Sequence, residues 1–269
     1  MTLAWEPVTL ASGARAHYLQ AGSGAPLVFL HSFVYPRTDD ALFSALAAHF
    51  EAFLVLAPGC FDFEEIEELD DVHDLALYYD DVLRAVGLRR VHLVGHSFGG
   101  LVAAELAAHF PERAASLSLV CPYGFFDPEY PTVDLSTLPL DKLLAASGSP
   151  VGTELSGPGG PDEIEETLAR SRAATAALKF MWPFPDQGLT RRAHRVPPGT
   201  LVIWGRNDGL NPPQYARRFA EALDDAELVE VDGGHFVPYE RPDELAAQIA
   251  AHAHKQRSTM DDSMNSDEA

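Results

Sequence analysis

The stretch Leu93-Val94-Gly95-His96-Ser97-Phe98-Gly99-Gly100 decides the fold. An apolar run leads into it, and an alanine- and leucine-rich segment follows it as far as Phe110. This order predicts a buried strand, a sharp turn and a helix, the context in which G-x-S-x-G carries a nucleophilic serine. Gly95 and Gly99 flank Ser97 because a Cβ at either position would collide with so tight a turn. The competing interpretation is a glycine-rich turn whose serine does no chemistry.

Apolar runs of strand length alternate with amphipathic segments of helix length on both sides of this turn. The expected strands are 3–10, 14–19, 27–31, 52–57, 91–94, 116–121, 200–204 and 226–231. The expected helices between them are 39–50, 72–86, 98–110, 212–223 and 242–254. Such alternation is typical of an α/β protein with a doubly wound, mainly parallel sheet.

The alternation stops between residues 122 and 198, where proline and glycine are dense and no strand is expected. Helices are expected here at 141–146 and 162–182. We therefore predict an α/β core made of 1–121 and 199–254, with a small helical lid inserted at 122–198. Residues 255–269 have no apolar periodicity, so we expect a disordered tail there.

The composition restricts the classes of partner. A net charge of −21 argues against nucleic acid and against an anionic membrane surface. No apolar run approaches the roughly 20 residues needed to cross a bilayer, and the first residues do not resemble a signal peptide. Two cysteines make a disulfide framework improbable, so a cytoplasmic protein acting on a small molecule is expected. The sequence leaves the oligomeric state open.

Two downstream residues can serve a serine nucleophile, because a hydroxyl needs a base and the base needs an orienting group. Asp208 and His235 each follow an expected strand, so both should lie at the carboxyl edge of the sheet, where open α/β sheets place their sites. Taken alone, each residue is a weak signal, since the chain has 11 histidines and Asp232 is a competing carboxylate. Their order after Ser97 is the one expected for this architecture.

The motifs GHSFGG (95–100), LVIWGRND (201–208) and VDGGHFVPYERP (231–242) resemble the α/β-hydrolase superfamily, in particular its single-domain members with a helical lid. The resemblance covers residues 15 to 255 apart from the inserted segment. It implies an eight-stranded sheet whose second strand is antiparallel. It also implies that Ser97 is the nucleophile, His235 the general base and Asp208 the orienting acid, without a metal or cofactor.

The same resemblance implies an oxyanion hole made of the backbone N–H groups of Phe33 and Phe98. Ser32 stands where these proteins usually have glycine. We expect that serine simply tolerates the backbone conformation, and the alternative is that its hydroxyl adds a donor to the pocket.

A mostly apolar, aromatic pocket is expected, which suits a neutral acyl or aryl group. The candidate substrate-binding residues are Ser32, Phe33, Phe125, Phe126, Trp182, Leu210 and Phe236, with Phe184 near the second hinge of the insertion. The insertion aromatics could instead only attach the lid to the core. Arg191, Arg192 and Arg195 leave open a site for an anionic group.

An acidic run from Asp62 to Asp74 has no Ca²⁺-loop spacing, so a solvated acidic surface is expected rather than a cation site. If it lies near the entrance, its field favours neutral or cationic substrates.

These observations predict a serine hydrolase that cleaves a small, mostly apolar, neutral ester, thioester or lactone through an acyl-enzyme. The alternatives are a C–C bond hydrolase or an acyltransferase using the same triad, or a non-catalytic ligand-binding member of the fold. The natural substrate is not set by these motifs, because the lid specifies it.

Overall fold

A single eight-stranded sheet organises the protein, in a computed structural model that describes residues 3–150, 163–182 and 186–267. The strand order is β1-β2-β4-β3-β5-β6-β7-β8. The strands are β1 (Glu6–Thr9), β2 (Arg15–Gly22), β3 (Pro26–Leu30), β4 (Glu51–Val55), β5 (Val91–His96), β6 (Ala114–Val120), β7 (Leu201–Gly205) and β8 (Glu227–Val231). β2 pairs antiparallel with both of its neighbours, and all pairs from β4 to β8 are parallel. The predicted fold class, including the antiparallel second strand, is confirmed.

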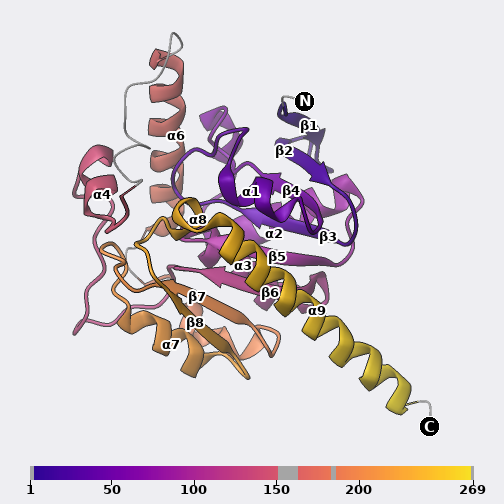
Figure 1. Ribbon diagram of the computed structural model, residues 1–269. Coiled ribbons are helices and arrows are strands. Elements are labelled where there is room, and N and C mark those ends of the chain that lie inside the picture. Colours follow the sequence, from indigo (N-terminus) through magenta and orange to yellow (C-terminus); the bar gives the residue numbers. More distant parts are fainter. Residues whose placement is uncertain (1–2, 151–162, 183–185, 268–269) are drawn as a thin grey trace.

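Helices cover both faces of this sheet (Figure 1), which explains why the central strands β3, β5 and β6 are buried along almost their whole length. α1 (Ala41–Leu46) and α9 (Pro242–Asp267) pack together on one face, and α2 (Val72–Val86) packs with α3 (Phe98–His109) on the other. α7 (Gln214–Ala222) packs against β7 and β8, and the short helix α8 (Val237–Glu240) leads into α9.

The turn between β5 and α3 consists of one residue, Ser97, whose φ is 58° and ψ −119°. This left-handed backbone conformation is costly for a residue with a side chain and needs support from its surroundings. The two flanking glycines allow the close approach that gives this support. A Cβ on Gly95 would lie 2.3 Å from the Gly99 carbonyl oxygen, and a Cβ on Gly99 would lie 2.1 Å from the Leu30 carbonyl oxygen. The predicted strand, turn and helix are therefore present.

The segment between β6 and β7 contains α4 (Leu140–Ala146), α6 (Glu163–Met181) and the one-turn helices η3 (Leu189–Arg191) and η4 (Ala193–Arg195). The first two match the expected helices. α6 rises away from the sheet in Figure 1, and its C-terminal half is attached to η1 (Phe63–Ile66), where the Lys179 ammonium donates to the Ile66 carbonyl oxygen at 2.6 Å.

The C-terminal segment differs from the prediction. The expected last helix ended at residue 254, with a disordered tail after it, but α9 continues to Asp267 and extends away from the body of the protein (Figure 1). Lys255 pairs with Glu227 at 3.0 Å and the Gln256 amide donates to the Gly199 carbonyl oxygen at 3.0 Å, so the helix is tied to the core beyond the predicted end. The absence of apolar periodicity indicates that a segment buries no apolar face, but it does not exclude a helix. Polar residues such as lysine and glutamine are good helix formers. Residues 268–269 lie outside the described range.

Among the helices of the described residues, none combines the length and the apolar character that a membrane crossing requires.

The first prediction concerns Gly95. Gly95→Ala should lower the free energy of unfolding by about 3 kcal/mol or more, because its methyl group would overlap backbone atoms that cannot move independently. Gly13→Ala is the control: Gly13 has a positive φ of 89° but no atom within 4 Å of an added Cβ, so only a backbone cost of about 1 to 2 kcal/mol is expected. Urea unfolding measures both, and equal losses would contradict the packing argument.

Candidate active site

Ser97, Asp208 and His235 come from three separate turns and meet at the carboxyl edge of the parallel strands. Ser97 follows β5, Asp208 follows β7 and His235 follows β8. The Ser97 Oγ lies 2.7 Å from His235 Nε2, and His235 Nδ1 lies 2.7 Å from Asp208 Oδ2. All three are buried, with Asp208 only 5% exposed. The structure thus brings together the three residues that the sequence pointed to.

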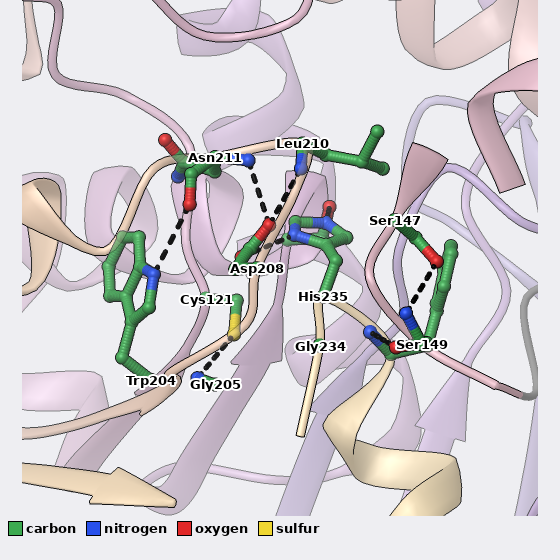
Figure 2. A network of polar contacts seen from close by, with 12 residues as sticks. Cys121, Ser147, Ser149, Trp204, Gly205, Asp208, Leu210, Asn211, Gly234 and His235 are labelled. Atoms are coloured by element: carbon green, nitrogen blue, oxygen red, sulfur yellow. Dashed lines mark hydrogen bonds and ion pairs between the residues drawn. The ribbon is translucent and has the colours of Figure 1, made fainter. Parts of the chain in front are cut away.

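Asp208 is held so that one carboxylate oxygen faces the histidine (Figure 2). Its Oδ1 accepts hydrogen bonds from the backbone N–H groups of Leu210 at 2.9 Å and Asn211 at 2.8 Å. Oδ2 remains for His235 Nδ1, which therefore donates, so that Nε2 can accept the Ser97 proton. The competing carboxylate, Asp232, is 71% exposed and pairs with Arg241 instead.

The loops that carry Asp208 and His235 are joined by one carbonyl group from the inserted segment. Directly after α4, the Ser147 carbonyl oxygen accepts from the backbone N–H of His235 at 2.9 Å and from that of Gly209 at 3.2 Å. Figure 2 shows this segment beside the His235 loop. The insertion therefore fixes the relative position of the two loops, a role that the sequence gave no sign of.

Ser149 and Glu240 form a second connection to the histidine loop. The Ser149 hydroxyl donates to Glu240 Oε1 at 2.5 Å and accepts from the Phe236 backbone N–H at 2.8 Å. The same Glu240 oxygen accepts from the Gly234 backbone N–H at 2.9 Å. The backbones approach so closely that a Cβ on Gly234 would lie 2.3 Å from the Gly148 carbonyl carbon.

Two buried histidines that the sequence analysis did not single out support the site. His96 Nε2 donates to the His235 carbonyl oxygen at 2.8 Å, and burial lowers the pKa of His96 to about 3. His31 Nδ1 donates to the Ser32 carbonyl oxygen at 2.7 Å, its Nε2 accepts from the Ala57 N–H at 2.9 Å, and burial lowers its pKa to about 4. Each directly precedes a predicted site residue, Ser97 or Ser32, and that adjacency was the available signal.

The two residues proposed for the oxyanion hole lie beside this arrangement. Phe98 is the first residue of α3, so its N–H has no partner within the helix. The Phe33 ring centre lies 6.4 Å from that of His235. Ser32 is absent from the described non-glycine residues with positive φ, which explains why serine fits there, and its Oγ accepts from the Val34 N–H at 3.1 Å. The joint role of the two N–H groups stays a prediction.

Buried aromatic side chains surround the His235 imidazole. The ring centres of Phe236 and Tyr123 lie 5.4 and 5.6 Å from that of His235, and Phe33 packs against Phe236. Leu210 is also buried, in the turn that follows Asp208. Tyr123 was missed by the sequence analysis, although it is the second residue after the expected strand 116–121.

The insertion aromatics are arranged differently from one another. Phe125 stacks on Phe219 at 4.1 Å, which makes it part of the core beside α7. Phe126 is 38% exposed and Trp182 is 69% exposed, so both rings face solvent rather than an enclosed wall. Phe184 lies outside the described residues.

Two of the three arginines considered for anion binding have other partners. The Arg192 guanidinium binds both Glu105 carboxylate oxygens, at 2.7 and 2.5 Å. Arg195 donates to the Ala108 carbonyl oxygen at 2.8 Å, and the Arg191 side chain is exposed. Both bound arginines therefore hold the C-terminal half of α3.

Two members of the acidic run cap helices. Asp62 accepts from the Glu64 N–H at the start of η1, and Asp71 accepts from two N–H groups at the start of α2. With the β1–β2 hairpin and α2, this segment lines a surface cavity of about 970 Å³ whose lining includes none of the three site residues.

Comparison with known proteins gives a consistent result. Residues 27–248 match the model of the "Alpha/beta hydrolase family". The chain is 26% identical to "Lipase 1" of Psychrobacter immobilis, over 91% of this chain and 82% of the relative. It is 24% identical to a 2-hydroxy-6-oxo-6-phenylhexa-2,4-dienoate hydrolase of Comamonas testosteroni, over 85% of this chain and 87% of the relative. The solved structure of a putative lipase from Acinetobacter baumannii AYE superposes with a TM-score of 0.75 at 21% identity, covering 96% of this chain and 93% of that one.

The second prediction concerns acid stability. His31 and His96 are buried with pKa values of about 4 and 3, against an ordinary value of 6.5 that applies in the unfolded chain. The unfolded state therefore binds these protons first, so their contribution to stability is complete above pH 6.5 and is lost as the pH falls toward those folded-state values.

Each histidine should account for a loss of about 2 kcal/mol in the free energy of unfolding between pH 8 and pH 5. Urea titrations at the two pH values measure this loss. His31→Gln should reduce the pH dependence, whereas the exposed His49→Gln should leave it unchanged. Equal stability of the wild type at both pH values would show that the buried pair is not held neutral.

Proposed function

Because the chain belongs to the alpha/beta hydrolase family, we propose that it is a serine hydrolase that cleaves a small, mostly apolar, neutral carboxylic ester, thioester or lactone through an acyl-enzyme. The observation that carries the proposal is the continuous hydrogen-bonded path from Ser97 through His235 to Asp208. Along this path, Ser97 can act as nucleophile, His235 as base and Asp208 as the acid that orients the base.

The first half of the reaction follows from these contacts. Ser97 Oγ attacks the carbonyl carbon of the substrate while its proton passes to His235 Nε2. Asp208 accepts the Nδ1 proton in a hydrogen bond and stabilises the imidazolium that forms. The intermediate then collapses, the alcohol or thiol takes the proton from Nε2, and an acyl group remains on Ser97.

The negative charge on the substrate oxygen needs donors that are already in position. The backbone N–H groups of Phe33 and Phe98 are proposed to supply them, a contribution of about 3 to 4 kcal/mol per donor in related chemistry. In the second half, water replaces the alcohol. His235 takes a proton from this water, the hydroxide attacks the acyl carbon, and Ser97 regains its proton on leaving.

The surroundings of the path support a neutral, apolar acyl group. Phe33, Tyr123 and Phe236 surround the imidazole. A net charge of −21 disfavours the approach of an anion. Of the three arginines considered for an anion site, Arg192 and Arg195 are bound to α3.

A second candidate function is hydrolysis of a carbon–carbon bond, which the relative named as a 2-hydroxy-6-oxo-6-phenylhexa-2,4-dienoate hydrolase favours. The two candidates are separated by a panel of p-nitrophenyl esters, lactones and dienol diketones assayed with the wild type. Faster turnover of the diketones by a large margin would favour the second candidate.

The third prediction tests the path itself. A fluorophosphonate probe should label Ser97, and the label should disappear in Ser97→Ala and in His235→Ala. Asp208→Asn should lower kcat by about 10⁴-fold, as the loss of an orienting carboxylate does elsewhere. The control is Asp232→Asn, which removes an exposed carboxylate next to the same loop and should change kcat little. A protein that hydrolyses esters but resists the probe, or keeps its activity in Ser97→Ala, would contradict the proposal.

The fourth prediction concerns the connection from the insertion to the histidine loop. Ser149→Ala should leave the buried Phe236 N–H without its acceptor, at a cost of about 1 to 3 kcal/mol, while Glu240 Oε1 keeps the Gly234 N–H. If this displaces His235, kcat should fall by about tenfold or more while KM changes little. Ser136→Ala is the matched control, because Ser136 is exposed in the same segment and its hydroxyl donates to the neighbouring Asp134. Equal kcat values in the two variants would show that the connection does not position the base.

A further inference from the structure

Three side chains able to bind a metal ion meet at the far end of α3 from Ser97. They are His73 on α2 and Glu105 and His109 on α3, and one donor atom from each lies within 4.8 Å of the others. Glu105 and His109 are four residues apart, so they share one face of the helix. Because α3 rises about 1.5 Å per residue, Glu105 lies about 12 Å and His109 about 18 Å along the helix from Ser97. It is therefore separate from the candidate active site.

The two imidazoles face each other with the spacing that a metal ion requires. His73 Nδ1 lies 3.2 Å from His109 Nε2. Two nitrogens bound to a tetrahedral zinc ion at about 2.0 to 2.1 Å are separated by about 3.3 Å. A bound ion would thus leave the separation of the two nitrogens almost unchanged, and each ring would tilt so that its nitrogen points at the ion rather than at the other nitrogen.

The tautomer of His109 is also set for binding. Its Nδ1 donates to the Glu105 carbonyl oxygen at 2.8 Å, so the lone pair lies on Nε2, which faces His73. Ligating histidines are commonly oriented by this kind of backbone contact. Without an ion, His73 Nδ1–H donates to that lone pair. Moving the proton to His73 Nε2 leaves both facing nitrogens free to bind.

The surroundings allow an ion and its water to enter. His73 and His109 are half-buried, and the side chain of His109 is 27% exposed. The Glu105 carboxylate is buried and its charge is offset by Arg192, so the two histidines are the principal ligands. The cluster lies at the C-terminal end of α3, where the helix dipole favours positive charge.

We propose that His73 Nδ1 and His109 Nε2 bind one zinc-type divalent ion, with solvent completing its coordination, because both Glu105 carboxylate oxygens are already held by Arg192. The ion joins α2 to α3, the helix that begins at Ser97. Its effect is therefore on stability rather than on the chemical step. The sequence analysis expected no metal. His73 is 32 residues from Glu105 along the chain, so the three residues form no recognisable ligand spacing.

A second group, Cys121, Asp208 and His235, also has donor atoms within 4.8 Å of one another. Asp208 and His235 are already bonded to each other and to Ser97, and all three members are buried. An ion there would displace the hydrogen bonds of the site and block Ser97. Any test with zinc must therefore distinguish the two groups.

The fifth prediction is made for the full chain after EDTA treatment and dialysis, titrated with zinc chloride by calorimetry. The wild type should bind one equivalent of zinc, and zinc should raise its thermal midpoint. His73→Ala and His109→Ala should each weaken binding by more than about 100-fold, since changes even outside the ligand set cost about 10- to 100-fold. His49→Ala removes an exposed histidine elsewhere and should leave the affinity unchanged.

Circular dichroism establishes that each variant is folded, and His73→Gln provides a second substitution at the same position. Substitution by Co²⁺ adds a direct signature, because visible absorption of the wild-type complex should be lost in the two histidine variants. The proposal is overturned if the wild type binds no zinc, or if both variants bind it as tightly as the wild type. It is equally overturned if zinc blocks fluorophosphonate labelling of Ser97 with the same affinity in all variants, which would assign the ion to the Cys121 group.

Discussion

The structure depends on the one-residue turn that joins β5 to α3. The chain must leave the sheet and enter a helix at Ser97, in a left-handed conformation that no serine prefers. Because Gly95 and Gly99 have no side chain, β5, α3 and the end of β3 can approach closely enough to hold Ser97 in this conformation. The strain is thus maintained by the packing of the central sheet, and its result is a hydroxyl fixed at the edge where the parallel strands end.

The rest of the site is assembled around that fixed hydroxyl by backbone contacts. The Ser147 carbonyl oxygen joins the loops of Asp208 and His235, and His96, the neighbour of Ser97, holds the His235 carbonyl. Segments that are distant in the sequence therefore position the imidazole from two sides. The inserted segment is therefore part of the support of the base.

The sequence was sufficient for the parts of the protein that obey local rules. The order of strands and helices along the chain and the turn at Ser97 followed from apolar runs. The positions of Asp208 and His235 followed from their places directly after expected strands. It was insufficient where the outcome depends on contacts between distant segments. The roles of Ser147 and His31 could not be predicted, because their partners are set by tertiary packing. The extension of α9 to Asp267 was missed because a solvated helix carries no apolar pattern.

The central claim is that Ser97 accepts the acyl group. The most direct measurement is rapid-quench mass spectrometry during turnover of p-nitrophenyl acetate, with peptide mapping of the trapped enzyme. The account predicts an acetyl group on the peptide that contains Ser97, formed within the first turnover and absent in His235→Ala. Steady hydrolysis without a covalent adduct, or an acetyl group on another residue that is chemically competent to turn over, would contradict it.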